Sequence, residues 1–217
     1  MKNTKKSSIK IIGLTGIYCS GKNYVAQLLE QRSIPVLDVD KLGHVAIEKE
    51  KERIFELFGD KILGNDGLID RRRLGNTVFG KKRALAALEE IIHPVVNQET
   101  LTWINSRKEN ACVINAALLH RSSAFETLDA VIVVEAPFIV RLFRARTRDH
   151  LPWGALIRRF RSQNKFNSQY FKEETDIYRV SNPSSCANSG YFGVRNRSLR
   201  KKLENRIDEI LSLQGIT

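Results

Sequence analysis

A glycine-rich segment near the start of the chain has the residue types and spacing that phosphate binding requires. It reads Gly16-Ile17-Tyr18-Cys19-Ser20-Gly21-Lys22-Asn23 and matches the pattern GxxxxGK of a phosphate-binding loop, or P-loop. Glycines let the backbone curl so that successive N–H groups face one anion, and Lys22 adds a positive charge for the β- and γ-phosphates. The segment predicts a nucleoside triphosphate site whose expected binding residues are Gly16, Cys19, Ser20, Gly21, Lys22, Asn23 and Tyr24.

The last position of this pattern departs from the rule. A P-loop usually ends in Ser or Thr, whose hydroxyl ligates Mg²⁺, whereas this chain has Asn23. An amide oxygen can also ligate Mg²⁺, but the side chain is longer and the ion demands near-ideal octahedral geometry. We therefore expect ATP and Mg²⁺ as cofactors and Asn23 as the metal ligand, with magnesium held less tightly or through a water molecule.

The elements that must position this loop alternate between strands and helices. Apolar runs at residues 9–14, 34–37, 113–119 and 130–134 predict strands, and residues 178–180 predict a weaker fifth. An amphipathic helix follows the P-loop, and the chain ends in a helix whose apolar face is Leu199, Leu203, Ile207, Ile210 and Leu211. This order predicts an α/β fold in which helices cover both faces of a parallel sheet.

Two insertions interrupt the alternation. The segment between the second and third predicted strands exceeds what a simple crossover requires and has helical periodicity. The dipeptide His93-Pro94 is predicted to end one of its helices. A second insertion, at about residues 141–173, is arginine-rich and helical, and residues 182–193 have the composition of a loop.

Composition and charge narrow the class of protein. The net charge of +12 and the pI of about 9.8 attract polyanions, either nucleic acids or small molecules with several phosphates. The N-terminal apolar run is too short for a signal peptide, and the chain has no apolar stretch of the roughly 18 residues that a membrane span needs. The cysteines, Cys19, Cys112 and Cys186, lack metal-ligand spacing. We therefore expect a cytoplasmic protein without a membrane partner, and make no prediction about its oligomeric state.

Several segments together resemble the dephospho-coenzyme A kinase family. The first are Gly13-Leu14-Thr15-Gly16, Gly21-Lys22, and Leu37-Asp38-Val39-Asp40 with His44 four residues on. The others are Asp66-Gly67-Leu68-Ile69-Asp70-Arg71 with Leu74 and Val78-Phe79, then Ile91-Ile92-His93-Pro94, then Arg148-Asp149 with Arg159 and Gln163, and finally Asn182. They occur in the family's order and with near-correct spacing, from about residue 9 to 182.

The resemblance implies a fold, an activity and a set of site residues. The implied fold is a three-layer P-loop kinase domain covering residues 1–217, with a five-stranded parallel sheet, a helical substrate subdomain at 41–104 and a helical lid at 141–173. The implied activity is phosphorylation of the ribose 3′-hydroxyl of dephospho-CoA by ATP, the last step of coenzyme A synthesis. We expect Asp40 to accept the hydroxyl proton, Lys22 and Arg148 to be catalytic with it, and Arg148 and Arg159 to bind the nucleotide. The expected substrate-binding residues are Asp38, Asp40, His44, Arg71 and His93.

Other roles remain open for some of these residues. Asp38 could cap the helix that follows it, which would leave Asp40 for chemistry. His93 could be a partly buried structural histidine, and Arg148 and Arg159 could lie on a solvated helix face. Asn115, Ala117 and His120 stand where the family has Asp, Pro and Glu, and Arg141 replaces its usual Gln.

Three other functions compete with the expected kinase. They are a different P-loop kinase for a nucleotide or sugar, a degenerate or repurposed family member, and a nucleic-acid-binding protein. Basic clusters at 71–73, 81–83, 141–148 and 158–161 favour the last, but no RNA- or DNA-binding signature accompanies them. Over these alternatives we favour a dephospho-CoA kinase that departs from the family pattern at the positions named above but remains active.

Overall fold

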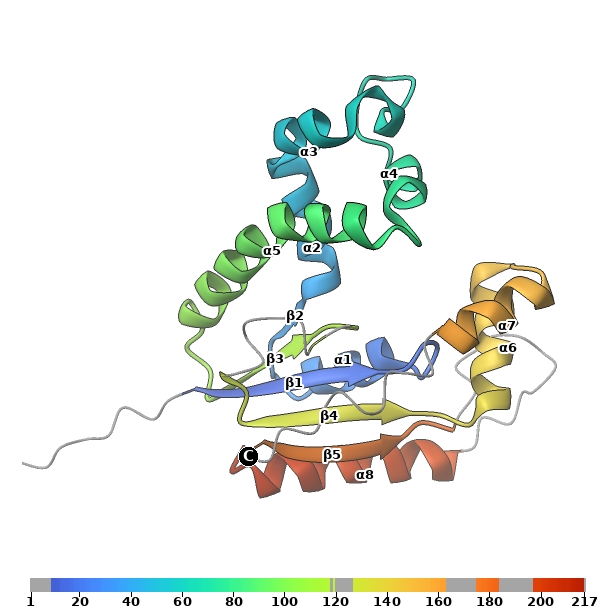
Figure 1. Cartoon of the computed structure of the whole chain (residues 1–217). Coiled ribbons are helices and arrows are strands. Elements are labelled where there is room, and N and C mark those ends of the chain that lie inside the picture. The colour runs from blue at the N-terminus through green and yellow to red at the C-terminus, as the bar shows by residue number, and fades with distance from the viewer. Residues whose placement is uncertain (1–8, 118, 120–126, 163–174, 184–196, 217) are drawn as a thin grey trace, which may run out of the picture. The chain divides into compact units, whose positions relative to one another are not determined.

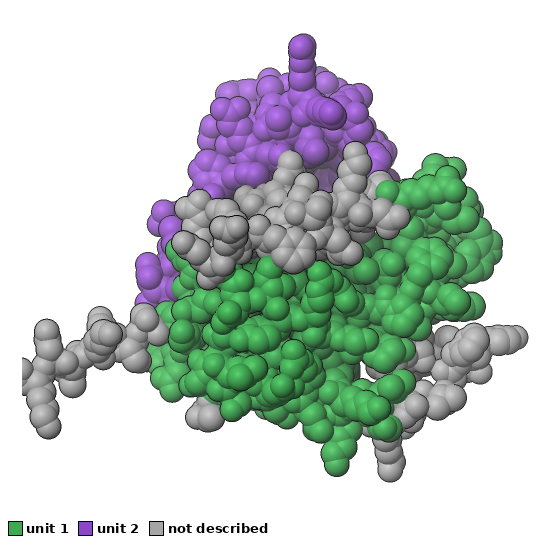
Figure 2. All heavy atoms as spheres, turned by 60° about the horizontal axis from the view of Figure 1, so that its bottom comes forward, with its two compact units in different colours: residues 1–37, 107–217 green, residues 38–106 purple. Residues whose placement is uncertain are grey.

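The computed structural model describes residues 9–117, 119, 127–162, 175–183 and 197–216. The chain forms two compact units, residues 1–37 with 107–217 and residues 38–106 (Figure 2). Among the described residues, no helix is both long and apolar enough to cross a membrane.

A five-stranded sheet of order β2-β3-β1-β4-β5 forms the centre of the first unit (Figure 1). The strands are β1 Lys10–Gly16, β2 Val36–Asp38, β3 Ala111–Asn115, β4 Ala130–Glu135 and β5 Asp176–Ser181. β1 pairs in parallel with both β3 and β4, and β4 pairs in parallel with β5. The predicted α/β fold with a five-stranded parallel sheet is confirmed.

The third strand is shorter than predicted. β3 ends at Asn115, and the chain turns at Ala117 instead of continuing to Leu119. Leu119 is nevertheless fully buried, and it packs so closely over Gly13 that a Cβ on this glycine would lie 2.4 Å from its side chain. Ala116 and Leu119 are therefore core residues outside the strand, and a pattern of hydrophobicity alone does not distinguish such residues from a strand.

Helices α1 (Lys22–Glu30) and α8 (Arg197–Leu213) pack against the sheet. Alternate residues of a strand point to the same face, so Ile12 and Leu14 of β1 lie on one face of the sheet. They belong to a single buried cluster with Leu28 and Leu29 of α1 and with Leu203, Ile207 and Ile210 of α8. The strand before the P-loop and the helix after it are thus both anchored in one core.

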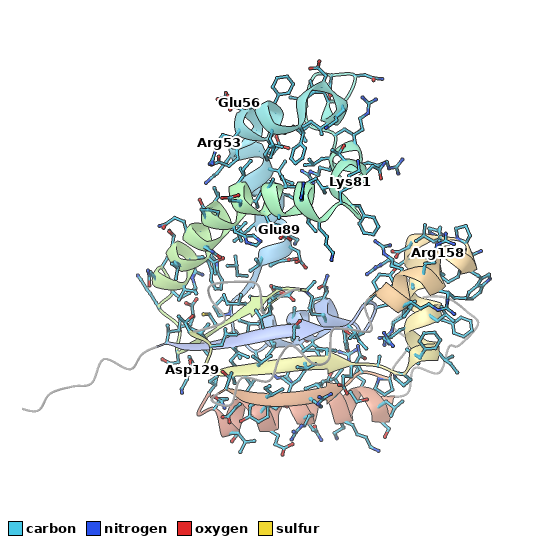
Figure 3. The ribbon with its side chains drawn as sticks, in the orientation of Figure 1. Arg53, Glu56, Lys81, Glu89, Asp129 and Arg158 are labelled. Atoms are coloured by element: carbon cyan, nitrogen blue, oxygen red, sulfur yellow. The ribbon has the colours of Figure 1, made fainter. Side chains whose placement is uncertain are left out.

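The amino-terminal ends of β1 and β4 are joined by a carboxylate. Asp129 accepts hydrogen bonds from the backbone N–H of Ile11 (2.7 Å) and from Nζ of Lys10 (3.1 Å) (Figure 3). These contacts fix the strands at the edge opposite the one where the P-loop follows β1. Ligands of open parallel sheets bind at the carboxyl ends of the strands, so the P-loop lies at the edge where a site is expected.

The second unit is helical and has its own core. Its helices are α2 Val39–Lys49, α3 Lys51–Phe58, α4 Arg71–Val78 and α5 Lys82–Asn105, with a 3₁₀ turn at Gly59–Ile62. Ile54, Ile62, Leu74 and Leu88 pack together in its interior. The carboxylate of Asp70 caps α4 by accepting hydrogen bonds from the backbone N–H groups of Arg73 and Arg72. These bonds hold the pKa of Asp70 below its usual value.

The prediction that His93-Pro94 ends a helix is wrong. α5 runs from Lys82 to Asn105 with Pro94 in its interior, although proline lacks the N–H that would bond to the carbonyl four residues earlier. Ile91 before the proline and Val96 after it are both buried. Their burial on either side of Pro94 stabilises both halves of the helix against the local preference of proline.

Candidate active site

The P-loop connects β1 to α1, and its backbone conformation restricts which residue types fit at several of its positions. A Cβ on Gly16 would lie 2.7 Å from the carbonyl oxygen of Val134, so only glycine fits there. Gly21, at the N-terminus of α1, has a φ of 92°, and Cys19 also has a positive φ, of 59°. The first turn of a helix presents N–H groups and the positive end of its dipole to an anion. The loop therefore forms a cradle for phosphate.

Two side chains from outside the loop bind its carbonyl groups. Arg144 of α6 (Phe138–Asp149) donates from Nη1 to the carbonyl oxygens of Cys19 (3.1 Å) and Ser20 (2.7 Å), and from Nη2 to that of Asn182 (3.0 Å). The side-chain amide of Asn182 also donates to the Ser20 carbonyl, at 3.0 Å. Because the C=O and N–H of a planar trans peptide point in opposite directions, fixing the Ser20 carbonyl also fixes the N–H of Gly21.

Arg144→Lys should weaken ATP binding about tenfold. Lysine keeps the charge but loses the planar fork that reaches these carbonyls. Hydrogen bonds from charged groups contribute about 1.5–3 kcal/mol, and about 1.4 kcal/mol corresponds to a factor of ten. Calorimetric titration with ATP measures the change. Arg146→Lys is the matched control, because Arg146 lies on the same helix and bonds instead to the Leu151 carbonyl; equal losses in both variants would contradict the bracing role.

The two predicted lid arginines meet beside the P-loop. Arg148 of α6 and Arg159 of α7 (Trp153–Ser162) each place the guanidinium carbon 5.1 Å from the ring centroid of Tyr18. Both also pair with Asp149, at 2.7 Å and 3.2 Å respectively. The remainder of the predicted lid, residues 163–173 with Gln163, lies outside the described residues.

Positive charge is concentrated around Cys19. Burial raises the pKa of its thiol, while the charges of Arg148, Arg144, Arg159 and Arg141 act to lower it. Four arginines thus surround one half-buried loop residue, an arrangement that favours an anionic ligand. This cluster accounts for part of the chain's net positive charge.

The residues expected near a metal are neutral amides. Asn23 is exposed in the first turn of α1, and Asn115 is buried at the end of β3. Among the described residues, Oδ1 of Asn115 and Oγ of Ser20 are buried without a hydrogen-bond partner, and no three His, Cys, Asp or Glu side chains form a metal-binding group. Magnesium with nucleotides is usually held by one or two carboxylates and the phosphates. These residues fit an ion held chiefly by the triphosphate. His120, which replaces the family's Glu, lies outside the described residues.

The residues expected to bind the acceptor belong to the second unit. Asp40, in the first turn of α2, and His44, four residues later, are both exposed and share one face of the helix. Arg71 is exposed at the start of α4, and His93 is half-buried in α5. The predicted nucleotide residues, in contrast, all lie in the first unit.

Asp38 does not cap α2 with its side chain. It occupies the N-cap position, but its carboxylate accepts no capping hydrogen bond, so the alternative role considered for it is wrong. The carboxylate instead lies 3.9 Å from Nζ of Lys41, and its Oδ1 is buried without a partner in the described part of the chain. Because Asp38 also ends β2, its backbone continues the strand up to the start of the helix.

Sequence reasoning missed Tyr18 and Arg144. Arg144 lies four residues before Arg148 on α6, so helical spacing places both on one face and was a usable signal. Tyr18 occupies one of the unspecified positions of the GxxxxGK pattern, which gives no indication of its role.

A phosphate-binding loop follows the central strand of a parallel sheet, and Lys22 begins the next helix. Four arginines lie around this loop, and together these features define a P-loop kinase. A sequence model of the family described as Dephospho-CoA kinase matches residues 10–181. A Treponema denticola dephospho-CoA kinase is 31% identical over 187 residues, which cover 82% of this chain and 84% of that protein. The chain belongs to the dephospho-CoA kinase family, as its sequence motifs predicted, and it is an enzyme.

Solved structures agree with this assignment. TT1252 from Thermus thermophilus superposes with a TM-score of 0.74 at 28% identity, covering 93% of this chain and 97% of that one. Dephospho-CoA kinase from Campylobacter jejuni gives a TM-score of 0.61 at 26% identity and covers 92% and 96%. The similarity therefore extends over nearly the whole chain.

Proposed function

We propose that this enzyme transfers the γ-phosphoryl group of ATP to the ribose 3′-hydroxyl of dephospho-CoA and releases coenzyme A and ADP. The observation that carries the proposal is the P-loop, braced by Arg144 and Asn182 in a chain of this family. The free thiols of Cys19 and Cys112 are typical of a reducing cytoplasm, where we place the reaction.

The nucleotide side of the reaction is assigned to the first unit. Backbone N–H groups of the P-loop and Lys22 hold the β- and γ-phosphates, and Arg148 and Arg159 neutralise the charge that spreads over the oxygens during transfer. Magnesium, with Asn23 as its protein ligand, would add charge neutralisation between the β- and γ-phosphates.

The acceptor side is assigned to the second unit. Asp40 orients the 3′-hydroxyl and takes its proton late in a loose transition state, as the new O–P bond forms and the bond between the γ-phosphorus and the leaving ADP oxygen breaks. Asp38, His44, Arg71 and His93 are the proposed contacts to dephospho-CoA. The compact unit 38–106 supports the proposed substrate subdomain 41–104, and α6 and α7 supply the described part of the proposed lid.

Asn23→Ser should raise turnover several-fold at limiting Mg²⁺ and have little effect at saturation. The shorter hydroxyl suits the near-octahedral geometry of magnesium better than the amide does. The measurement is ADP release as a function of Mg²⁺ concentration at fixed ATP. The same half-saturating Mg²⁺ concentration in the wild type and the variant would count against Asn23 as a ligand.

A substrate panel tests the proposed function. Coupled ADP release is followed with dephospho-CoA and, separately, with nucleoside monophosphates as acceptors. We expect release with dephospho-CoA alone. Release with nucleoside monophosphates and none with dephospho-CoA would assign the chain to a different kinase reaction.

A further inference from the structure

Tyr18 joins the P-loop to the helices that carry the lid arginines. Ala145, Leu156 and Phe160 form a small buried core between α6 and α7, and Tyr18 and Cys19 pack against it. The Tyr18 ring meets Phe160 edge to face, with centroids 5.2 Å apart and an interplanar angle of 71°. The P-loop and the two helices therefore share one apolar cluster.

The same ring contacts both lid arginines. Each guanidinium carbon lies 5.1 Å from the ring centroid, within the range of a cation–π interaction. The side chains of Arg148 and Arg159 are 60% and 50% exposed, so without such contacts they would have many rotamers available. Tyr18 limits this freedom on the side of the P-loop.

Asp149 completes the arrangement. Its carboxylate accepts hydrogen bonds from the Tyr18 hydroxyl, from Nε of Arg148 (2.7 Å) and from Nη1 of Arg159 (3.2 Å). The carboxylate side chain is only 16% exposed. One negative charge faces two positive charges, so the group keeps a net positive charge beside the phosphate cradle.

We propose that Tyr18 and Asp149 are positioning residues that hold Arg148 and Arg159 beside the P-loop before the nucleotide binds. A triphosphate then meets arginines that are already oriented, and less side-chain freedom is lost on binding. Tyr18 acts through the arginines and does not touch the transferred group. The inference rests on the proposed role of the arginines toward phosphate, but not on the identity of the acceptor.

A double-mutant cycle on ATP affinity tests this proposal without any acceptor present. Tyr18→Leu, which keeps an apolar side chain against Phe160, should weaken ATP binding about fivefold, the scale of ordering one long side chain. Arg159→Met should weaken it at least as much. Because Tyr18 also holds Arg148, the double variant should bind ATP more weakly than Arg159→Met alone, but the combined loss should fall clearly short of the product of the two single losses. Losses that multiply in full would overturn the proposal.

The matched control is Arg158, the neighbour of Arg159 on α7 (Figure 3). Arg158→Met removes the same charge from the same helix, and its effect should combine multiplicatively with that of Tyr18→Leu. A coupling equal to that of Arg159 would mean that Tyr18 acts on the fold of the helix, and the proposal would fail.

Hydrogen exchange gives a readout that is independent of ligand binding. Without nucleotide, residues 138–162 should exchange faster in Tyr18→Leu than in the wild type, and Tyr18→Phe, which lacks only the hydroxyl bond to Asp149, should be intermediate. Unchanged exchange in both variants would contradict the proposal, and Tyr18→Phe keeps the test decisive if Tyr18→Leu does not fold. A lack of transfer to dephospho-CoA would contradict the proposed function alone, since neither measurement includes the acceptor.

Discussion

Asp40→Asn is expected to lower turnover about a thousandfold and to leave ATP affinity unchanged. Asparagine has nearly the shape of aspartate but cannot take the proton of the acceptor hydroxyl, and a positioned base contributes roughly 10²–10⁴ to a rate. Asp40 is exposed in the first turn of α2, so the substitution disturbs no buried packing. Steady-state ADP release gives kcat, and calorimetry gives the ATP affinity separately.

A control in the same unit separates chemistry from structure. Asp60 is exposed in the 3₁₀ turn of the second unit, and Asp60→Asn should have wild-type kinetics. If Asp40→Asn lost ATP affinity together with turnover, or lowered the melting temperature of the second unit, Asp40 would be a structural residue and the proposed base would have to be sought elsewhere.

Lys22→Met is expected to lower kcat/KM for ATP by about two to three orders of magnitude. Lys22 is the first residue of α1 and carries the positive charge of the P-loop, and removing one preorganised donor from a reaction centre costs about 10²–10³ in rate. Methionine keeps an unbranched stem and a good helix propensity. Because Val25, Leu28 and Leu29 anchor α1 in the core, we expect the fold to remain intact.

Lys202→Met is the control for the loss of one positive charge from the first unit. Lys202 is exposed on α8 of the same unit, so this variant loses the same charge away from the P-loop. Circular dichroism should show wild-type folding for both variants. Wild-type kinetics in Lys22→Met would contradict the assignment of the P-loop as the triphosphate site.

The local parts of the site could be predicted from the sequence. The glycines at 16 and 21, the apolar strand before them and the amphipathic helix after them are neighbours in the chain, so their types and spacing determine the loop directly. The structure explains why both positions require glycine. A Cβ at position 21 would lie 2.2 Å from the side-chain amide nitrogen of Asn182, and a Cβ at position 16 would clash with Val134 of β4.

The errors arose where distant packing overrides a local preference. Pro94 does not end α5, because buried residues on both sides hold the helix together. Asp38 is a separate case: a helix cap is one of the roles that the sequence leaves open for it, and its side chain accepts no capping bond. Ala116 and Leu119, which follow Asn115, are buried in the core, although they are not part of the strand.

Asn182 is part of the family pattern and helical spacing relates Arg144 to Arg148, but the bonds of these two residues to the P-loop could not be predicted, because the partners lie far apart in the chain. Arg144 reaches the Cys19 carbonyl across 125 positions, and Asn182 reaches that of Ser20 across 162. No pattern within a window of sequence contains both partners of such a bond. Only the folded sheet, which brings the ends of β1 and β5 and the start of α6 to one edge, makes these contacts possible.

Identification of the product tests the central claim most directly. The enzyme is incubated with ATP, Mg²⁺ and dephospho-CoA, and the product is analysed by mass spectrometry and phosphorus NMR. We predict that dephospho-CoA gains one phosphoryl group on the ribose 3′-oxygen, with one ADP formed for each molecule converted. Consumption of ATP without any phosphorylated dephospho-CoA, or a phosphate at another position, would contradict the claim.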